Sequence, residues 1–115
     1  RLLADYGQVR AGGQLRWDGV LISAPAGSDV VAVRSGRVAY ADWLPGLGQL
    51  LVIDHGGGWL SLYGHNQDLV HPVGREGAAG EVSAHVGDTG GQPRPALYFE
   101  VRRNGKPQNP HQWVK

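Results

Sequence analysis

Residues 94–103 have the sequence RPALYFEVRR, and the turn-forming pair Asn104-Gly105 follows them. Because the side chains of a β-strand point alternately to its two faces, this stretch predicts a strand with one apolar face and one mixed face. The apolar face carries Leu97, Phe99 and Val101, which we expect in the core. We expect the mixed face to be exposed and to form the floor of a groove; its residues are Ala96, Tyr98, Glu100 and Arg102.

Short extended runs separated by turn residues predict an all-β domain. Nineteen glycines and seven prolines are scattered between apolar runs, and no stretch shows a helical period with capping residues. The runs 49–54 and 59–65 are joined by His55 and three glycines, which predicts an antiparallel hairpin. Alternation in the second run places Leu60 and Leu62 inward and Ser61, Tyr63 and His65 outward. We expect an antiparallel sheet or sandwich of about six to nine short strands, with a central groove and little or no helix.

Length and composition indicate one domain without a strong electrostatic field. We expect residues 1–14 to form an arm or edge strand and residues 15–115 to form the single domain. Eleven Lys and Arg against ten Asp and Glu give a net charge of +1, which does not favour nucleic acid as a partner. The absence of cysteine excludes disulfides and thiolate metal sites. No apolar run approaches the roughly 18 residues of a membrane span, and the chain begins at Arg1 without a signal sequence, so we expect a fragment of a longer protein.

The five histidines do not have the spacing of a metal site. None lies two or four residues from another, whereas a strand-borne zinc site typically uses a His-x-His pair and a third ligand. In the strand at 94–103 such a pair would fall on Ala96 and Tyr98. Only His65 is expected on the groove face. Nucleophilic catalysis is not favoured either, since no serine lies in a Gly-x-Ser-x-Gly elbow.

Trp17 and Leu21 lie four residues apart in the extended run 14–23 and share a face if that strand is regular. The residues alone allow two interpretations of this pair. In the first it belongs to the core, as most apolar residues in a strand do. In the second it lines a groove.

Sequence blocks along most of the chain resemble the LytM (lysostaphin-like) zinc peptidase domain in order and spacing, from about Leu15 to Val114. They are WDGVLISAPAG (17–27), SGRVAYADW (35–43), GLGQLLVIDHGGGWLSLYGH (46–65), VGDTG (86–90) and PALYFEVRRNGKPQNPHQW (95–113). The resemblance implies the fold of that family. It also implies which positions correspond to the family's metal site.

In that family the first block reads His-x-x-x-Asp and the last reads His-x-His before Phe-Glu. The resemblance places Trp17, Leu21 and Tyr98 at the zinc-ligand positions and Ala96 at the first histidine of the pair. It places His65 at the family's catalytic histidine, which without zinc has no bound water to activate. The resemblance therefore implies a domain that is not an enzyme and needs no cofactor.

The chain is most similar to those degenerate LytM domains that act in the periplasm as activators of cell-wall amidases. This implies a non-catalytic activator of N-acetylmuramoyl-L-alanine amidases in cell division and septal peptidoglycan splitting. The amidase's regulatory helix would bind in the groove, and an upstream coiled coil, absent here, would connect the domain to FtsEX. The groove contacts that we expect are Leu21, Leu50, Tyr63, His65, Tyr98 and Arg102.

Three other interpretations are compatible with the same motifs. The domain could be an activator of the NlpD lipoprotein type, which shares the degenerate plan. It could be a peptidoglycan-binding module, because the groove of a peptidase of this family holds a cell-wall peptide. It could also be a zinc endopeptidase with substituted ligands, which metal analysis would reveal.

Overall fold

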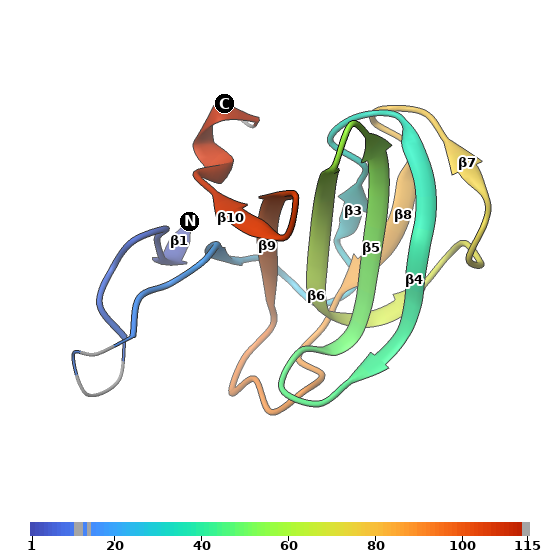
Figure 1. Ribbon diagram of the computed structural model, residues 1–115. Coiled ribbons are helices and arrows are strands. Elements are labelled where there is room, and N and C mark those ends of the chain that lie inside the picture. The colour runs from blue at the N-terminus through green and yellow to red at the C-terminus, as the bar shows by residue number, and fades with distance from the viewer. Residues whose placement is uncertain (11–12, 14, 114–115) are drawn as a thin grey trace.

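The computed structural model describes residues 1–10, 13 and 15–113 and shows a ten-stranded antiparallel sheet that folds back on itself (Figure 1). The prediction of an all-β antiparallel fold is confirmed. The strands are β1 (Leu2–Ala4), β2 (Val20–Ser23), β3 (Asp29–Val31), β4 (Gly36–Leu44), β5 (Gly48–Gly56), β6 (Trp59–Leu69), β7 (Glu76–Gly77), β8 (Val82–Val86), β9 (Ala96–Arg103) and β10 (Lys106–Gln108), and a short 3-10 helix, η2 (Pro110–Gln112), follows them.

The main path through the sheet has the order β1-β2-β9-β6-β5-β4-β7. In addition β10 pairs with β9, while β8 pairs with both β3 and β6. The hairpin predicted from residues 49–54 and 59–65 is present as β5 and β6, and both strands extend further than the sequence indicated. The stretch at 94–103 becomes β9, which lies between β2 and β6.

Strand β6 changes its partner along its length. From Trp59 to Gly64 it pairs with β9, and from Asn66 to Leu69 it pairs with β8. His65 lies at the change of partner and has a φ of 65°, a value that is sparsely populated for residues other than glycine. The strand bends at this residue. As a result β3 and β8 form a second layer, which Figure 1 shows behind β5 and β6.

The main core lies between these two layers. Phe99 and Val101 are 2% and 0% exposed, as their alternation in the strand predicts, and Leu97 packs against the same cluster while remaining partly exposed. The buried members of the cluster are Val20, Val30, Ala32, Val38, Leu51, Ile53, Tyr63, Ala84, Val86, Phe99 and Val101.

The facing predicted for β6 is wrong. Tyr63 lies opposite Phe99, and Ser61 lies opposite Val101, so both point into the main core. Leu60 and Leu62 lie on the other face of the sheet. The prediction assumed that the more apolar residues of β6 face the core. Both faces of this central strand are largely covered, however, and hydroxyl groups are accepted in a core when they are hydrogen-bonded.

A chain of hydrogen bonds satisfies the buried hydroxyls of Ser61 and Tyr63. Nδ1 of His55 donates to the carbonyl of Ser35 at 2.8 Å, which leaves Nε2 to accept from Oγ of Ser61 at 2.7 Å. The hydroxyl of Tyr63 then donates to Oγ of Ser61 at 2.7 Å and accepts from the backbone N–H of Val33 at 3.2 Å. The chain links β6 to β5 and to the segment after β3.

The N-terminal segment extends the sheet and then turns away from it. β1 pairs with β2, and Asp5 binds Nε2 of His111 at 2.6 Å, which ties this segment to η2. The predicted arm and domain include five residues that lie outside the described part of the chain, namely 11, 12, 14, 114 and 115. Within the part of the chain that the structure describes, no helix is long and apolar enough to cross a membrane.

We predict that Tyr63→Phe lowers the free energy of unfolding by about 1–3 kcal/mol, because it leaves the partly buried backbone N–H of Val33 without its acceptor and removes the hydrogen bond to the buried Ser61. Urea denaturation measures this change. Tyr40→Phe is the matched control, since the hydroxyl of Tyr40 donates to the carbonyl of Trp43 on an exposed surface. An equal or smaller loss of stability in the Tyr63 variant than in the control would contradict the assignment of Tyr63 to the core.

Candidate functional site

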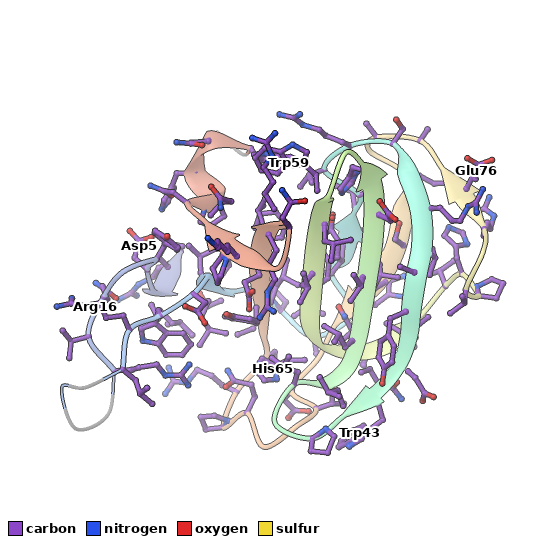
Figure 2. The ribbon with its side chains drawn as sticks, in the orientation of Figure 1. Asp5, Arg16, Trp43, Trp59, His65 and Glu76 are labelled. Carbon is purple, nitrogen blue, oxygen red and sulfur yellow. The ribbon has the colours of Figure 1, made fainter. Side chains whose placement is uncertain are left out.

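A groove with a cavity volume of about 350 Å³ lies beside the bend of β6. One wall comes from the segment before β2, the other from the β4–β5 turn, and the floor from the bend of β6 at His65 and from β9. In the view of Figure 2, His65 lies between the segment that carries Arg16 and the turn next to Trp43. The lining residues are Arg10, Trp17, Asp18, Pro45, Gly46, Leu47, His65, Gly90, Gln92, Tyr98 and Glu100.

A second hollow of about 390 Å³ lies at the edge formed by β4, β5 and β7. Its lining includes His55 and Glu76 but none of the residues at the positions of the family's metal site. We therefore take the groove beside β6 as the candidate site, because the sequence motifs converge there.

The structure brings together residues that lie far apart in the sequence. Trp17, His65 and Tyr98 all line the groove. The ring of Tyr98 lies between the other two, with centroids 6.2 Å from that of Trp17 and 6.3 Å from that of His65. Leu21 lies opposite Tyr98 on β2, and it packs with Ala96 below the groove in a small apolar cluster.

Four of the six predicted contacts do not line the cavity. One of them, Leu21, lies in the apolar cluster below it. Tyr63 is on the opposite face of the sheet, in the main core. Leu50 is buried at 4% exposure and does not line the cavity. Arg102 lies beyond Glu100 on the same face of β9, just outside the cavity, with a side chain that is 36% exposed.

The prediction that the mixed face of β9 is exposed is also wrong. Ala96, Tyr98 and Glu100 are 0%, 5% and 3% exposed. The apolar cluster below the groove also contains Ala4 of β1, and Trp17 and Leu47 pack against it. The face is buried because segments distant in the sequence cover it, which alternation within one strand does not reveal.

Two charged residues of the groove, Arg10 and Asp18, were not expected from the sequence. Arg10 places its guanidinium 4.0 Å from the ring centre of Trp17, a cation–π contact at the rim. Asp18 follows Trp17 in the same wall. Glu100 was assigned to the correct face of β9, but its link to two predicted contacts was not foreseen. No local pattern marks Arg10, since its position depends on how the N-terminal segment folds.

Glu100 connects Tyr98 to Arg102. The hydroxyl of Tyr98 donates to Oε2 of Glu100 at 2.7 Å, and Nε of Arg102 donates to Oε1. Burial raises the pKa of the Tyr98 hydroxyl, and the neighbouring charge of Glu100 raises it further. The hydrogen bond to Glu100 raises the pKa of Arg102. Tyr98 is therefore a neutral donor and Arg102 a fixed cation at physiological pH.

His65 is oriented by the loop that precedes β9. Its Nδ1 donates to the carbonyl of Thr89 at 2.7 Å, so in the neutral ring Nε2 is an acceptor. Burial lowers the pKa of the imidazole, and the hydrogen bond to Thr89 only partly opposes this effect. The groove thus holds a neutral imidazole at pH 7.

The sequence from residue 15 to residue 110 matches the model of peptidase family M23. This chain belongs to peptidase family M23. Among members with known sequences, it is 49% identical over 112 residues to "Murein hydrolase activator EnvC" of Escherichia coli, covering 97% of this chain and 26% of that protein. It is 32% identical over 115 residues to "Murein hydrolase activator NlpD" of the same organism, covering 99% of this chain and 29% of that protein.

The fold is shared with peptidases of the M23 family. The catalytic domain of the antimicrobial peptidase lysostaphin from Staphylococcus simulans superposes with a TM-score of 0.88 at 25% identity, covering 98% of this chain and 90% of that one. The M23 domain described here spans between a quarter and a third of the two activators.

Zinc is the metal that membership of the M23 family implies, but the residues present do not fit it. The positions that the resemblance assigns to the ligands carry an indole, an isobutyl group and a phenol, whereas zinc prefers imidazole, carboxylate and thiolate. The hydroxyl of Tyr98 donates its hydrogen to Glu100. Among the described residues, no group of three or more His, Cys, Asp or Glu is arranged to hold a metal ion.

We predict that His65 titrates below the ordinary histidine pKa of about 6.5, since burial disfavours the imidazolium. A histidine with a lowered pKa in the folded state contributes stability that is fully present above about pH 6.5 and is lost as the pH falls through the lowered pKa. NMR titration of the ring proton measures the pKa directly.

His65→Gln is the matched variant for this stability effect. Between pH 7 and pH 5 the wild-type protein is expected to lose more unfolding free energy than the variant. A measured pKa for His65 at or above 6.5 would contradict the burial argument.

Proposed function

We propose that this domain is a non-catalytic activator of N-acetylmuramoyl-L-alanine amidases and that its groove binds the amidase's regulatory helix. The observation that carries the proposal is the groove itself, where an aromatic and apolar lining occupies the positions that the resemblance assigns to zinc ligands. Two relatives named as murein hydrolase activators support the activator role.

The groove has the composition of a protein-binding hot spot. Trp, Tyr and Arg dominate such sites, particularly where they surround an apolar centre. Here Trp17 packs against an apolar cluster that contains Tyr98. The guanidinium of Arg10 lies over the ring of Trp17, and Arg102 lies just outside the cavity. An amphipathic helix that binds in a groove presents apolar anchors at intervals of three and four residues.

The size of the cavity indicates how such a helix would bind. One turn of a helix with its side chains fills about 400–600 Å³, from a diameter of about 10–12 Å and a pitch of 5.4 Å. The groove offers about 350 Å³. We infer that the helix lies across the mouth and inserts only a few anchor side chains between Trp17 and Leu47.

The cellular setting of the proposal is the periplasm, at the septum of dividing cells. In this proposal an upstream coiled coil connects the domain to FtsEX. These features concern the whole protein, whereas the domain corresponds to 26% of the length of EnvC. We propose no cofactor for the activator role.

We predict that Arg102→Ala raises the concentration of the protein needed for half-maximal amidase activation by at least about tenfold, the effect of losing one hot-spot side chain. Dye release from labelled sacculi, with an amidase that is inactive alone, measures activation. Arg102 is the preferred position because its side chain is partly exposed. Its removal leaves the buried carboxylate of Glu100 without a cation, so the melting temperature of each variant is measured alongside activation.

Arg103→Ala is the matched control for this experiment. Arg103 is exposed, neighbours Arg102 in β9 and lies 5.2 Å from the ring centre of Trp59, away from the groove. Full activation by the Arg102 variant, or an equal loss in the control, would show that the groove is not the amidase-binding surface.

We predict that purified protein retains no stoichiometric zinc after incubation with the metal and dialysis, since the residues that the structure describes contain no suitable ligand set. Elemental analysis measures the bound metal, and labelled sacculi without amidase measure intrinsic hydrolysis. A zinc-dependent peptidase of the M23 family serves as the positive control. Stoichiometric zinc or dye release by the protein alone would instead support an endopeptidase with substituted ligands.

Direct binding of peptidoglycan is a second candidate function. It is favoured by the close superposition on the catalytic domain of lysostaphin, a peptidase with the same fold. Co-sedimentation with sacculi in the absence of amidase separates this function from activation. An NlpD-type role would differ from an EnvC-type role in the segments that precede the domain.

A further inference from the structure

Glu100 is a buried carboxylate that binds two polar side chains at once, one in the groove and one just outside it. It is 3% exposed, accepts from the hydroxyl of Tyr98 through one oxygen, and accepts from Nε of Arg102 through the other. The three residues alternate along one face of β9, so a single strand carries the whole arrangement.

The backbone packs closely against Glu100. Gly19 lies so close that an added Cβ would be 2.9 Å from Cγ of Glu100 and 3.0 Å from the hydroxyl of Tyr98. The backbone just before β2 therefore closes over the carboxylate. Because β9 is paired on both sides, the strand that carries Glu100 is also held in place.

We propose that Glu100 is a positioning residue, which holds Arg102 and Tyr98 in the conformation that binds the partner. This inference rests on the proposed function, because it concerns the same groove. An arginine side chain loses rotamer freedom when it is fixed at an interface, and affinity improves when the fold has already fixed it. Glu100 occupies only the Nε donor of Arg102, which leaves the terminal amino groups for oxygen acceptors on the regulatory helix.

The test is a double-mutant cycle with Glu100→Gln, Arg102→Ala and the double variant. The readout is the concentration that gives half-maximal activation of an amidase that the wild-type protein activates, and the melting temperature of each variant is measured in parallel. Glutamine keeps the shape of the side chain but removes the charge that binds Arg102.

We expect Glu100→Gln alone to raise the half-maximal concentration about tenfold, and to add less than about twofold when Arg102 is already alanine, because the two residues act as a unit. Glu81→Gln is the matched control. Glu81 also binds an arginine, with Nη1 of Arg75 at 2.6 Å, but it lies outside the groove. The half-maximal concentration of the Glu81→Gln variant should equal that of the wild-type protein.

A second measurement does not depend on the partner. In the free wild-type protein, the Nε–H of Arg102 should give a protected NMR signal, and this protection should be lost in the Glu100 variant. Two results would overturn the proposal. One is a half-maximal concentration of the Glu100→Gln variant equal to that of the wild-type protein. The other is an equal fold-increase from Glu100→Gln with and without Arg102, which a purely structural role predicts. A wild-type protein that activates no amidase would overturn the proposed function itself and this inference with it.

Discussion

The structure depends on β9 being covered on both edges and on both faces. β2 and β6 satisfy its backbone, one face packs into the main core through Phe99 and Val101, and the other carries the Tyr98–Glu100 hydrogen bond beneath the groove. A strand in this position cannot shift its register by one residue without moving core residues into the groove. The alignment of the groove floor is therefore as firmly fixed as the core.

The walls of the groove have a different origin. Trp17 and Arg10 come from the segment that follows β1, and Leu47 comes from the β4–β5 turn, so each wall is a connection between strands. Connecting segments vary more easily than the strands they join, and binding surfaces are commonly built from them. The groove therefore combines a rigid floor of paired strands with walls formed by loops.

The polar groups of the groove show how its chemistry differs from that of a metal site. A zinc site concentrates lone pairs on one point, whereas here the hydroxyl of Tyr98 and the guanidinium of Arg102 both direct hydrogen atoms to Glu100. His65 is kept neutral by burial and oriented by Thr89. The groove therefore combines apolar groups with hydrogen-bonding groups of fixed orientation, which in the proposed function recognise a helix.

The sequence by itself determined the fold class, the β5–β6 hairpin, the placement of Phe99 and Val101 in the core and, through the order of its motifs, the family. Period-two alternation and turn residues are local signals, so they were sufficient for these features. Only the tertiary structure decided that Tyr63 faces the core and that Arg10 and Asp18 line the groove. Both faces of a central strand are covered by segments distant in the sequence, and hydrogen bonds to such segments make a buried hydroxyl or carboxylate acceptable.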